Sequence, residues 1–316
     1  MAARTTESMH AEATGLDARP PNDILKILLQ AQIEAAMAVR HALPAIVQAA
    51  ELAAASLSSG GRLIYAGAGS SGLMAMADAL ELPGTFGIPH DRIAILFAGG
   101  MDGLTEFTGG PEDDSGLARR EVVTLSPIPK DCVIATTASG STPYAVAALE
   151  AARLAGARTI GIANNEAAPL FDYADVPVLL PTPPEVVAGS TRMGAGTAQK
   201  IALNLLSTLM AIQLGHVHDG YMVNLRADNL KLRDRAVRIV AAIAGCSTED
   251  AGIWLDKADG SIKSAVLLAA GASDKAAAEN MLDNAGQYLR AALSKIKGNT
   301  DSVYPALEAP QTGRKK

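Results

Sequence analysis

The stretch Leu63-Ile-Tyr-Ala-Gly-Ala-Gly-Ser-Ser-Gly72 decides the fold, because a short apolar run leads into a glycine-rich turn and then into a helical pattern. Four more apolar runs bounded by Gly, Ser or Pro follow, at Ile93–Phe97, Cys132–Thr136, Thr159–Ala163 and Val176–Leu180. Segments of helical composition lie between them, at Leu73–Leu80, Ser115–Val123 and Tyr144–Ala155. This alternation predicts an α/β fold with a doubly wound, flavodoxin-like sheet of five parallel strands.

Helical patterns also flank the predicted sheet. Residues 1–21 are polar and predict an extended arm, and a helical pattern then runs from Asn22 to about Ser58, with a break or restart at Pro44. Beyond the sheet, long helices are predicted over Thr191–Leu214 and Leu225–Ala244. We therefore expect an N-terminal arm with helices (1–58), a sheet domain (59–245), a small helical domain (246–297) and a flexible tail (298–316).

Composition excludes several classes of protein. The 316 residues carry a formal net charge of −6, whereas a nucleic-acid-binding protein normally presents a basic face. The five histidines show no convincing metal-ligand spacing, so no metal is expected. The N-terminal residues do not resemble a signal peptide, and no apolar stretch is long enough to cross a membrane. These features predict a soluble, cytoplasmic protein that binds neither nucleic acid nor membrane.

The turn after the first predicted strand is a candidate anion site. Its residues Gly69, Ser70 and Ser71 open a helix, where backbone N–H groups and the helix dipole favour negative charge. The same turn matches the dinucleotide-binding pattern G-x-G-x-x-G, which also requires an acidic residue after the second strand. Asp102 follows that strand later than this pattern expects. The dinucleotide interpretation is therefore weak, and no cofactor is expected.

A second hydroxyl-rich turn follows the third predicted strand, with Ser139, Gly140, Ser141 and Thr142. Both turns are expected at the carboxyl edge of the sheet, where ligands bind in doubly wound folds. Two such turns suit one phosphate and a sugar better than a dinucleotide. A third polar segment could complete the pocket with Ser190, Thr191 and Arg192, although Thr191 could equally be a simple helix N-cap.

Several longer segments resemble the N-acetylmuramic acid 6-phosphate etherase family, whose members have the sugar-isomerase (SIS) fold. They are Glu81–Gly87, Pro111–Asp114, Gly189–Lys200 and Asn229–Arg235. The resemblance implies a carbon-oxygen lyase of cell-wall amino-sugar recycling. Such an enzyme removes D-lactate from the sugar by elimination and then adds water, without a metal or nucleotide. A regulator that binds sugar phosphates without catalysis, like the glucokinase regulators, and an aldose–ketose isomerase remain the alternative functions.

The resemblance also assigns two catalytic carboxyl groups, with Glu81 as general acid and Glu112 as general base. The local sequence is consistent with these roles. Pro83 is expected to end the helix that carries Glu81, so that the negative end of the helix dipole favours a protonated side chain there. Glu112 follows Gly109-Gly110-Pro111 and is expected to start a helix, where the dipole favours a carboxylate.

Substrate contacts are expected from the three polar segments, to which the family pattern adds Lys200. The family carries basic residues at three positions where this chain has Leu73, Ser141 and Gly194. Either hydroxyls, helix N-termini, Arg192 and Lys200 replace those charges, or the ligand is less anionic. The predicted helix Thr191–Leu214 is apolar nearly all round, which indicates a position that is buried or faces a second subunit of a homodimer.

Overall fold

The computed structural model describes residues 5–105, 109–225, 227 and 229–296. The chain divides into two compact units, Met1–His216 and Val217–Lys316. The predicted flexible tail (298–316) lies outside the described residues.

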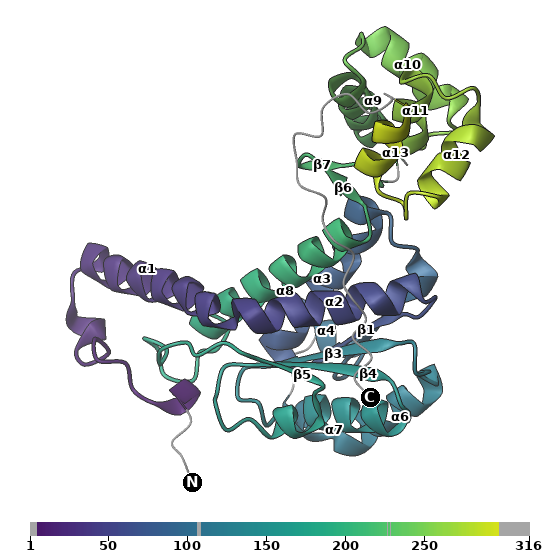
Figure 1. Ribbon diagram of the computed structural model, residues 1–316. Coiled ribbons are helices and arrows are strands. Elements are labelled where there is room, and N and C mark those ends of the chain that lie inside the picture. The colour runs from purple at the N-terminus through teal and green to yellow at the C-terminus, as the bar shows by residue number, and fades with distance from the viewer. Residues whose placement is uncertain (1–4, 106–108, 226, 228, 297–316) are drawn as a thin grey trace, which may run out of the picture. The chain divides into compact units, whose positions relative to one another are not determined.

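The N-terminal unit is built on one five-stranded parallel sheet (Figure 1), which confirms the predicted fold class. The strand order is β2-β1-β3-β4-β5, the order of flavodoxin-like folds. Chain direction along the sheet reverses between β1 and β3, so the loops that follow these two strands meet at the topological switch point. The strands are β1 (Leu63–Gly67), β2 (Ile93–Phe97), β3 (Cys132–Thr137), β4 (Arg158–Ala163) and β5 (Val176–Leu179).

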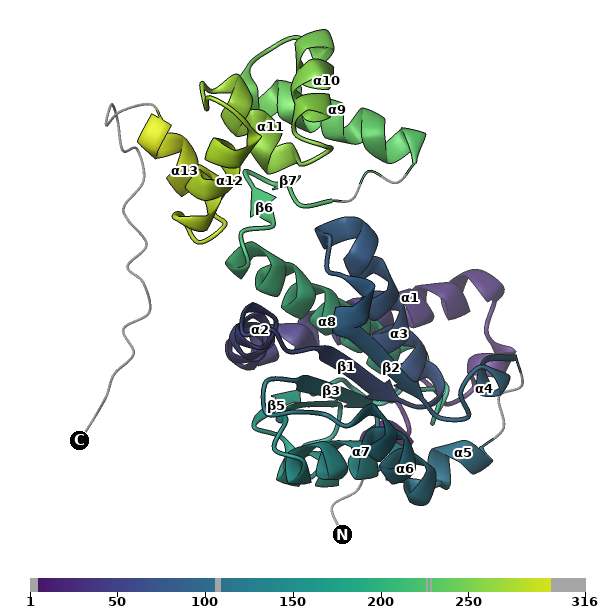
Figure 2. The same ribbon diagram turned by 90° about the vertical axis from the view of Figure 1, so that its right-hand side faces the viewer.

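Helices cover both faces of the sheet (Figure 2), which is why the central strands β1 and β3 are apolar and buried throughout. One face carries α6 (Ser115–Leu125) and α7 (Pro143–Leu154), and the other carries α2 (Leu43–Ser58) and α3 (Gly69–Phe86). Helix α8 (Gly194–Gln213) packs against α2 and α3 and also against α1 (Pro21–Ala38). One side of the largely apolar α8 is therefore buried by helices of its own unit, while Leu205 and Ile212 are exposed.

The N-terminal segment is more ordered than the predicted extended arm. It contains two short 3-10 turns, Thr5–Glu7 and Leu16–Ala18, before α1 begins at Pro21. The break expected at Pro44 is confirmed, because α1 ends at Ala38 and α2 starts at Leu43 with the proline in its first turn. Two further single-turn helices, α4 (Asp102–Thr105) and α5 (Gly110–Asp113), lie between β2 and α6.

The C-terminal unit begins with a hairpin and continues as a bundle of helices. The hairpin pairs β6 (Val217–His218) with β7 (Tyr221–Met222), and the bundle has its own apolar core. Its helices are α9 (Leu230–Ala244), α10 (Thr248–Lys257), α11 (Ile262–Ala269), α12 (Lys275–Asp283) and α13 (Leu289–Ile296).

The observed division differs from the expected boundary at 245/246. Helix α9 packs on α10 and α11, so it belongs to the C-terminal unit and not to the sheet domain. The helix also starts at Leu230, later than predicted, where the side chain of Asn229 accepts a hydrogen bond from the N–H of Leu232 at 2.9 Å. Within the described residues, no helix is both long and apolar enough to cross a membrane.

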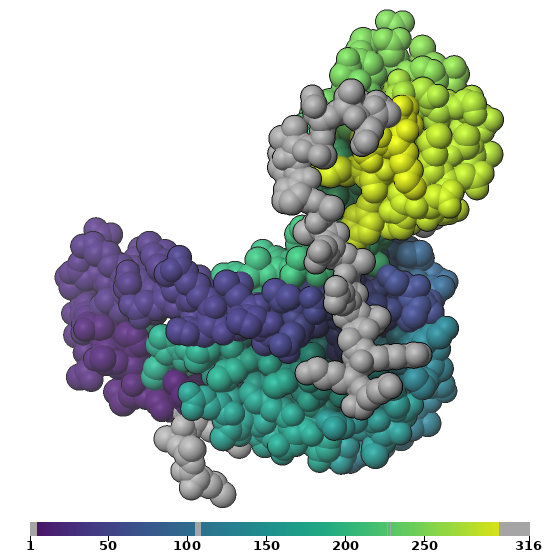
Figure 3. Space-filling model, in the orientation of Figure 1, coloured from purple at the N-terminus to yellow at the C-terminus, as the bar shows by residue number. Residues whose placement is uncertain are grey.

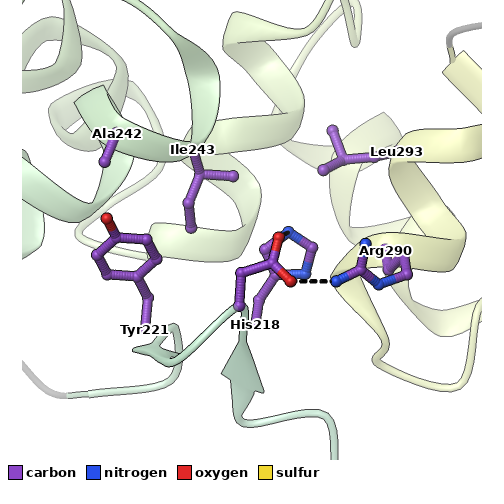
Figure 4. A pocket seen from close by; sticks show the side chains of 7 residues that line it. His218, Tyr221, Ala242, Ile243, Arg290 and Leu293 are labelled. Atoms are coloured by element: carbon purple, nitrogen blue, oxygen red, sulfur yellow. Dashed lines mark hydrogen bonds and ion pairs between the residues drawn. The ribbon is translucent and has the colours of Figure 1, made fainter. Parts of the chain in front are cut away.

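A cavity of about 330 Å³ lies within the C-terminal unit, and Figure 4 shows the side chains that line it. The hairpin turn contributes Asp219, which forms an ion pair with Arg290 of α13. Ile243 of α9 and Leu293 of α13 supply apolar wall. The cavity contains none of the predicted site residues.

Candidate active site at the carboxyl edge of the sheet

The first predicted anion loop joins β1 to α3. Gly69, Ser70 and Ser71 form the first turn of α3, and the side chain of Ser71 is buried. Gly69 adopts a left-handed backbone conformation with φ of +52°, which favours glycine. A Cβ atom at this position would lie 2.6 Å from Oε1 of Glu112, so a larger residue would displace that carboxyl group.

Glu112 therefore lies directly against the first turn of α3. It comes from α5, a single turn that packs against α7, and its side chain is half-buried. Burial raises the pKa of the Glu112 carboxyl above its usual range, and the charge of Asp113 raises it further. This direction is opposite to the one expected from a helix N-terminus. The single turn of α5 does not outweigh the loss of water around the carboxyl group.

The third-strand loop gathers four hydroxyl groups. Thr137, the last residue of β3, lies 2.8 Å from the hydroxyl of Thr142 and 3.4 Å from that of Ser139. Ser141 donates to the hydroxyl of Ser139 from both its backbone N–H and its side chain, each at 3.2 Å. The cluster lies at the N-terminus of α7, where Thr142 is the N-cap residue. Thr137 was not predicted, because it falls between the predicted strand Cys132–Thr136 and the hydroxyl-rich turn.

Asn165, which follows β4, supports this loop. Its side-chain amide donates to the carbonyls of Ala138 and Ser139, both at 3.2 Å, and to the hydroxyl of Thr6 at 3.1 Å. In a trans peptide the C=O and the N–H point in opposite directions. Because Asn165 binds the carbonyls of Ala138 and Ser139, the N–H groups of the same two peptide units point away from Asn165. The buried Thr6 belongs to the N-terminal segment. Neither Asn165 nor Thr6 was predicted as a site residue, since neither belongs to a motif.

The loop also requires Gly140, whose φ is +74°. A Cβ atom there would lie 2.2 Å from Cβ of Ala168, so any other residue would displace the loop. Packing against Ala168 and the hydrogen bonds from Asn165 therefore both fix the backbone of this turn.

The third predicted segment is arranged differently, because its helix N-terminus is already occupied. Helix α8 begins at Gly194, and the carboxylate of Glu185 accepts hydrogen bonds from the N–H groups of Gly194 at 2.9 Å and Ala195 at 2.8 Å. Glu185 is 4% exposed. Thr191 lies before the helix and is not its N-cap, which is Met193. The N-cap interpretation of Thr191 is therefore wrong, and its contact with the ligand stays a prediction.

Gly194 is closely packed. A Cβ atom there would lie 3.1 Å from Oε2 of Glu185 and 3.2 Å from Cβ of Ala35 in α1. A larger residue at this position would therefore require a small shift of α1 or of the Glu185 side chain. Of the other predicted contacts in this region, Ser190 is partly buried, whereas Arg192 and Lys200 are exposed.

Glu81 lies away from this cluster, and one expectation about it is wrong. Pro83 does not end α3, which continues to Phe86 with Gly87 as its C-cap. Glu81 is therefore an exposed residue before the last turn, and the argument from the negative helix end no longer applies. It follows Gly69 by twelve residues on the same helix, which corresponds to about 18 Å along the axis.

Metal ligation has no support in the part of the chain that the structure describes. No group of three His, Cys, Asp or Glu side chains there could hold a metal ion. The polar groups that the fold brings together are the carboxyl of Glu112, the hydroxyls of the two loops and the N-termini of α3 and α7. This arrangement combines one acid–base group with donors for an anion.

A doubly wound sheet with hydroxyl-rich loops after β1 and β3 defines a class, the SIS-domain proteins. SIS domain models match residues 30–164 and 123–209 of the chain. A solved structure, described as a putative phosphosugar isomerase involved in capsule formation from Bacteroides fragilis, has the same fold with a TM-score of 0.50 and 21% identity. The match covers 66% of this chain and 98% of that one.

Curated relatives narrow the class to one family. An N-acetylmuramic acid 6-phosphate etherase from Deinococcus radiodurans is 42% identical, over 92% of this chain and 96% of the relative. One from Streptomyces coelicolor is 40% identical, over 93% of this chain and 94% of the relative. The chain belongs to the N-acetylmuramic acid 6-phosphate etherase family, as the sequence motifs predicted.

Proposed function

We propose that this chain is a carbon-oxygen lyase that cleaves the D-lactyl ether of N-acetylmuramic acid 6-phosphate. Glu112 takes the C2 proton, which is weakly acidic beside the aldehyde of the opened sugar. The C3–O bond then breaks, and Glu81 protonates the departing oxygen of D-lactate. Water adds across the resulting double bond, with OH at C3 and H at C2, to yield N-acetylglucosamine 6-phosphate. This reaction belongs to the recycling of cell-wall amino sugars.

The observation that carries this proposal is the contact of the Glu112 carboxyl with Gly69 at the N-terminus of α3. It places a half-buried carboxyl group beside one of the two proposed phosphate loops. The raised pKa of this carboxyl brings it closer to neutral pH, where a general base is most effective. A regulator without catalysis would not need such a group at this position.

The phosphate is proposed to bind between the first turn of α3 and the loop before α7. Hydroxyls of Ser70, Ser71, Ser139, Ser141 and Thr142 donate to its oxygens, and the two helix N-termini supply much of the compensating charge. Support comes from the hydroxyl cluster at α7, where hydrogen bonds between the side chains gather their hydroxyl groups at the helix N-terminus. Arg192 and Lys200 remain proposed contacts of the sugar or its lactyl carboxylate.

We also propose that the protein is a cytoplasmic homodimer. Helix α1 presents an apolar row, with Leu25 63% exposed and Leu29 62% exposed, and Ile33 and Met37 continue it at the same helical spacing. Figure 3 shows α1 and α2 on the surface of the N-terminal unit in this view. Such a row favours a protein partner. The two cysteines, Cys132 and Cys246, are both unpaired, which is usual in a reducing compartment.

The test is release of D-lactate from N-acetylmuramic acid 6-phosphate by the purified protein. We expect D-lactate and N-acetylglucosamine 6-phosphate in equal amounts, and incorporation of solvent deuterium at C2. Conversion of an aldose phosphate to a ketose phosphate without lactate would indicate an isomerase. Binding of the sugar phosphate without turnover would indicate a regulator.

A further inference from the structure

The loops that form the candidate active site contain no basic residue. Segments 68–72 after β1 and 138–142 after β3 carry no charged side chain. Segment 109–114, which includes α5, carries three acidic residues, Glu112, Asp113 and Asp114. The positive charge that these loops present to a ligand is therefore limited to the N-termini of α3 and α7, about +0.5 at each.

Basic residues of the neighbouring segments are paired or exposed to water. Arg119 and Arg120 of α6 form ion pairs with acidic side chains, at 2.8 Å and 3.7 Å. Arg192 and Lys200 are exposed, and water weakens the effect of an exposed charge. The N-terminus of α8 adds no positive charge, because the carboxylate of Glu185 occupies it.

Glu112 lies in surroundings that disfavour further negative charge. Burial raises the pKa of its carboxyl group, and the charge of Asp113 raises it further. The carboxyl group lies against Gly69, so in its ionised form it already uses the positive end of α3. A second anion beside Glu112 therefore meets a carboxylate and no basic residue of these loops.

The free acid form of the proposed substrate brings such an anion with it. Its lactyl group is attached through oxygen to C3, the neighbour of the carbon from which Glu112 takes the proton. The lactyl carboxylate is therefore only a few bonds from C2, and its charge disfavours the ionised, basic form of Glu112. The 6-phosphate is at the other end of the sugar and is the group proposed for the N-termini of α3 and α7.

We propose that the preferred substrate of this chain carries its lactyl carboxyl group as an amide, as when the lactyl group is joined to the amino group of a peptide. An amide has no charge. Its N–H also donates a hydrogen bond, which the acidic segment 109–114 can accept and which a carboxylate cannot provide. The inference rests on the proposed function and names the substrate class of the same site.

The steps of the reaction stay the same with an amide. Glu112 takes the C2 proton, the C3–O bond breaks with its electron pair on the lactyl oxygen, and Glu81 protonates that oxygen. Water then adds OH at C3 and H at C2. The products are N-acetylglucosamine 6-phosphate and a D-lactyl amide.

The experiment compares two substrates with the purified full-length protein. One is N-acetylmuramic acid 6-phosphate, and the other is the same compound with its lactyl carboxyl group converted to the N-methyl amide. Release of N-acetylglucosamine 6-phosphate, which both substrates yield, is measured. We expect kcat/KM to be about 10-fold higher for the amide at low salt, because one repulsion between unit charges is removed. Added salt should reduce this preference, since it screens the repulsion.

The outcomes separate the inference from the proposed function. An equal or higher kcat/KM for the free acid would overturn the inference and leave the proposed reaction intact. Cleavage of neither substrate would overturn both. A preference for the amide that does not change with salt would also contradict the inference, because it would not be electrostatic.

A substitution on α3 provides a second test. Leu73 is partly buried and lies one turn after Gly69, and helix side chains lean toward the N-terminus. Leu73→Arg therefore places a cation near Glu112 and should raise kcat/KM for the free acid by about 10-fold, with little change for the amide. Leu73→Met is the matched control without charge and should keep the preference for the amide. An equal effect of Leu73→Arg on both substrates would contradict the inference.

Discussion

Helices α3 and α8 begin with similar sequences, but their N-termini have different surroundings. Both start in segments rich in Gly, Ser and Thr, Gly67–Gly72 and Gly189–Gly196. The first turn of α3 has partly exposed Gly69 and Ser70, and it faces a single half-buried carboxyl group, that of Glu112. The first turn of α8 is buried and bonded to the carboxylate of Glu185.

The difference shows that a glycine-rich turn before a helix does not by itself define an anion site. The dipole and the N–H groups attract negative charge in both helices. In α8 the chain satisfies them with its own side chain, so a ligand phosphate would have to displace a buried carboxylate. In α3 the neighbouring hydroxyl-rich loop and the accessible first turn leave the N-terminus open to ligand. We therefore propose that the phosphate binds at the N-termini of α3 and α7.

The largest effect on activity is expected at the N-terminus of α3, where Glu112 lies. Glu112→Gln keeps the shape of the side chain but removes the base, so D-lactate release should fall by about 10²–10⁴-fold. Binding of the sugar phosphate should remain, because the hydroxyl loops are unchanged. Deuterium uptake at C2, followed by NMR, should disappear. Persistent uptake in the variant would remove Glu112 from the role of base.

The pH profile of the wild-type enzyme provides the companion measurement. A base acts only when it is ionised, and burial raises the pKa of Glu112. Activity should therefore fall as pH decreases through this raised value, which lies above the range of an ordinary glutamate. The residual activity of Glu112→Gln should lack this acid limb. An acid limb at the ordinary glutamate range would show that the carboxyl is not desolvated in the active enzyme.

The next largest effect is expected on stability, at the N-terminus of α8, which the carboxylate of Glu185 occupies. Glu185→Ala leaves two buried N–H groups of α8 without an acceptor, which should lower the free energy of unfolding by about 2–4 kcal/mol. Chemical denaturation measures this change. Glu51→Ala, at an exposed position of α2, is the control and should change stability by about 0.5 kcal/mol or less.

Added inorganic phosphate tests whether the Glu185 carboxylate occupies an anion site at the N-terminus of α8. An anion can replace the missing carboxylate at the N-terminus of α8, so phosphate should stabilise Glu185→Ala more than it stabilises the wild-type protein. Equal stabilisation of the two proteins would show that Glu185 does not close an anion site.

Hydroxyl removal at the third-strand loop should reduce ligand affinity. Each hydrogen bond to a charged group contributes about 1.5–3 kcal/mol, so Ser139→Ala or Thr142→Ala should weaken sugar 6-phosphate binding by roughly 10–150-fold. Titration calorimetry measures the affinity. Ser126→Ala is the control, because this exposed serine follows α6 outside the predicted site. Unchanged affinity in both loop variants would place the phosphate elsewhere.

The smallest effect is expected at Thr6, which acts on the loop only through Asn165. Thr6→Val keeps the shape of the side chain but removes the hydroxyl that accepts a hydrogen bond from Asn165. The binding free energy of the sugar 6-phosphate should therefore become less favourable by about 1 kcal/mol. Thr6→Ser should restore it. The melting temperature should change little, since one neutral hydrogen bond is lost. A loss of stability without a loss of affinity would make the contact purely structural.

Much of the fold was predictable because it follows from short-range patterns. The five strands lie where apolar runs end in turn residues, since a strand buried on both faces must be apolar throughout. The unit boundary was not predictable, because the pattern of α9 does not say which core its apolar side contacts. Pro83 was misinterpreted for a similar reason, since helix packing held α3 together beyond it.

By itself, the sequence determined the α/β class, the two hydroxyl-rich loops and the family to which the chain belongs. All three depend on residues that are near neighbours along the chain. Only the tertiary structure decided that Glu185 closes α8, that Thr6 and Asn165 support the third-strand loop, and that Glu112 reaches Gly69 while Glu81 does not. Such contacts join segments that are distant in the sequence. Which of several similar side chains lies at a given helix N-terminus therefore depends on how these segments pack together.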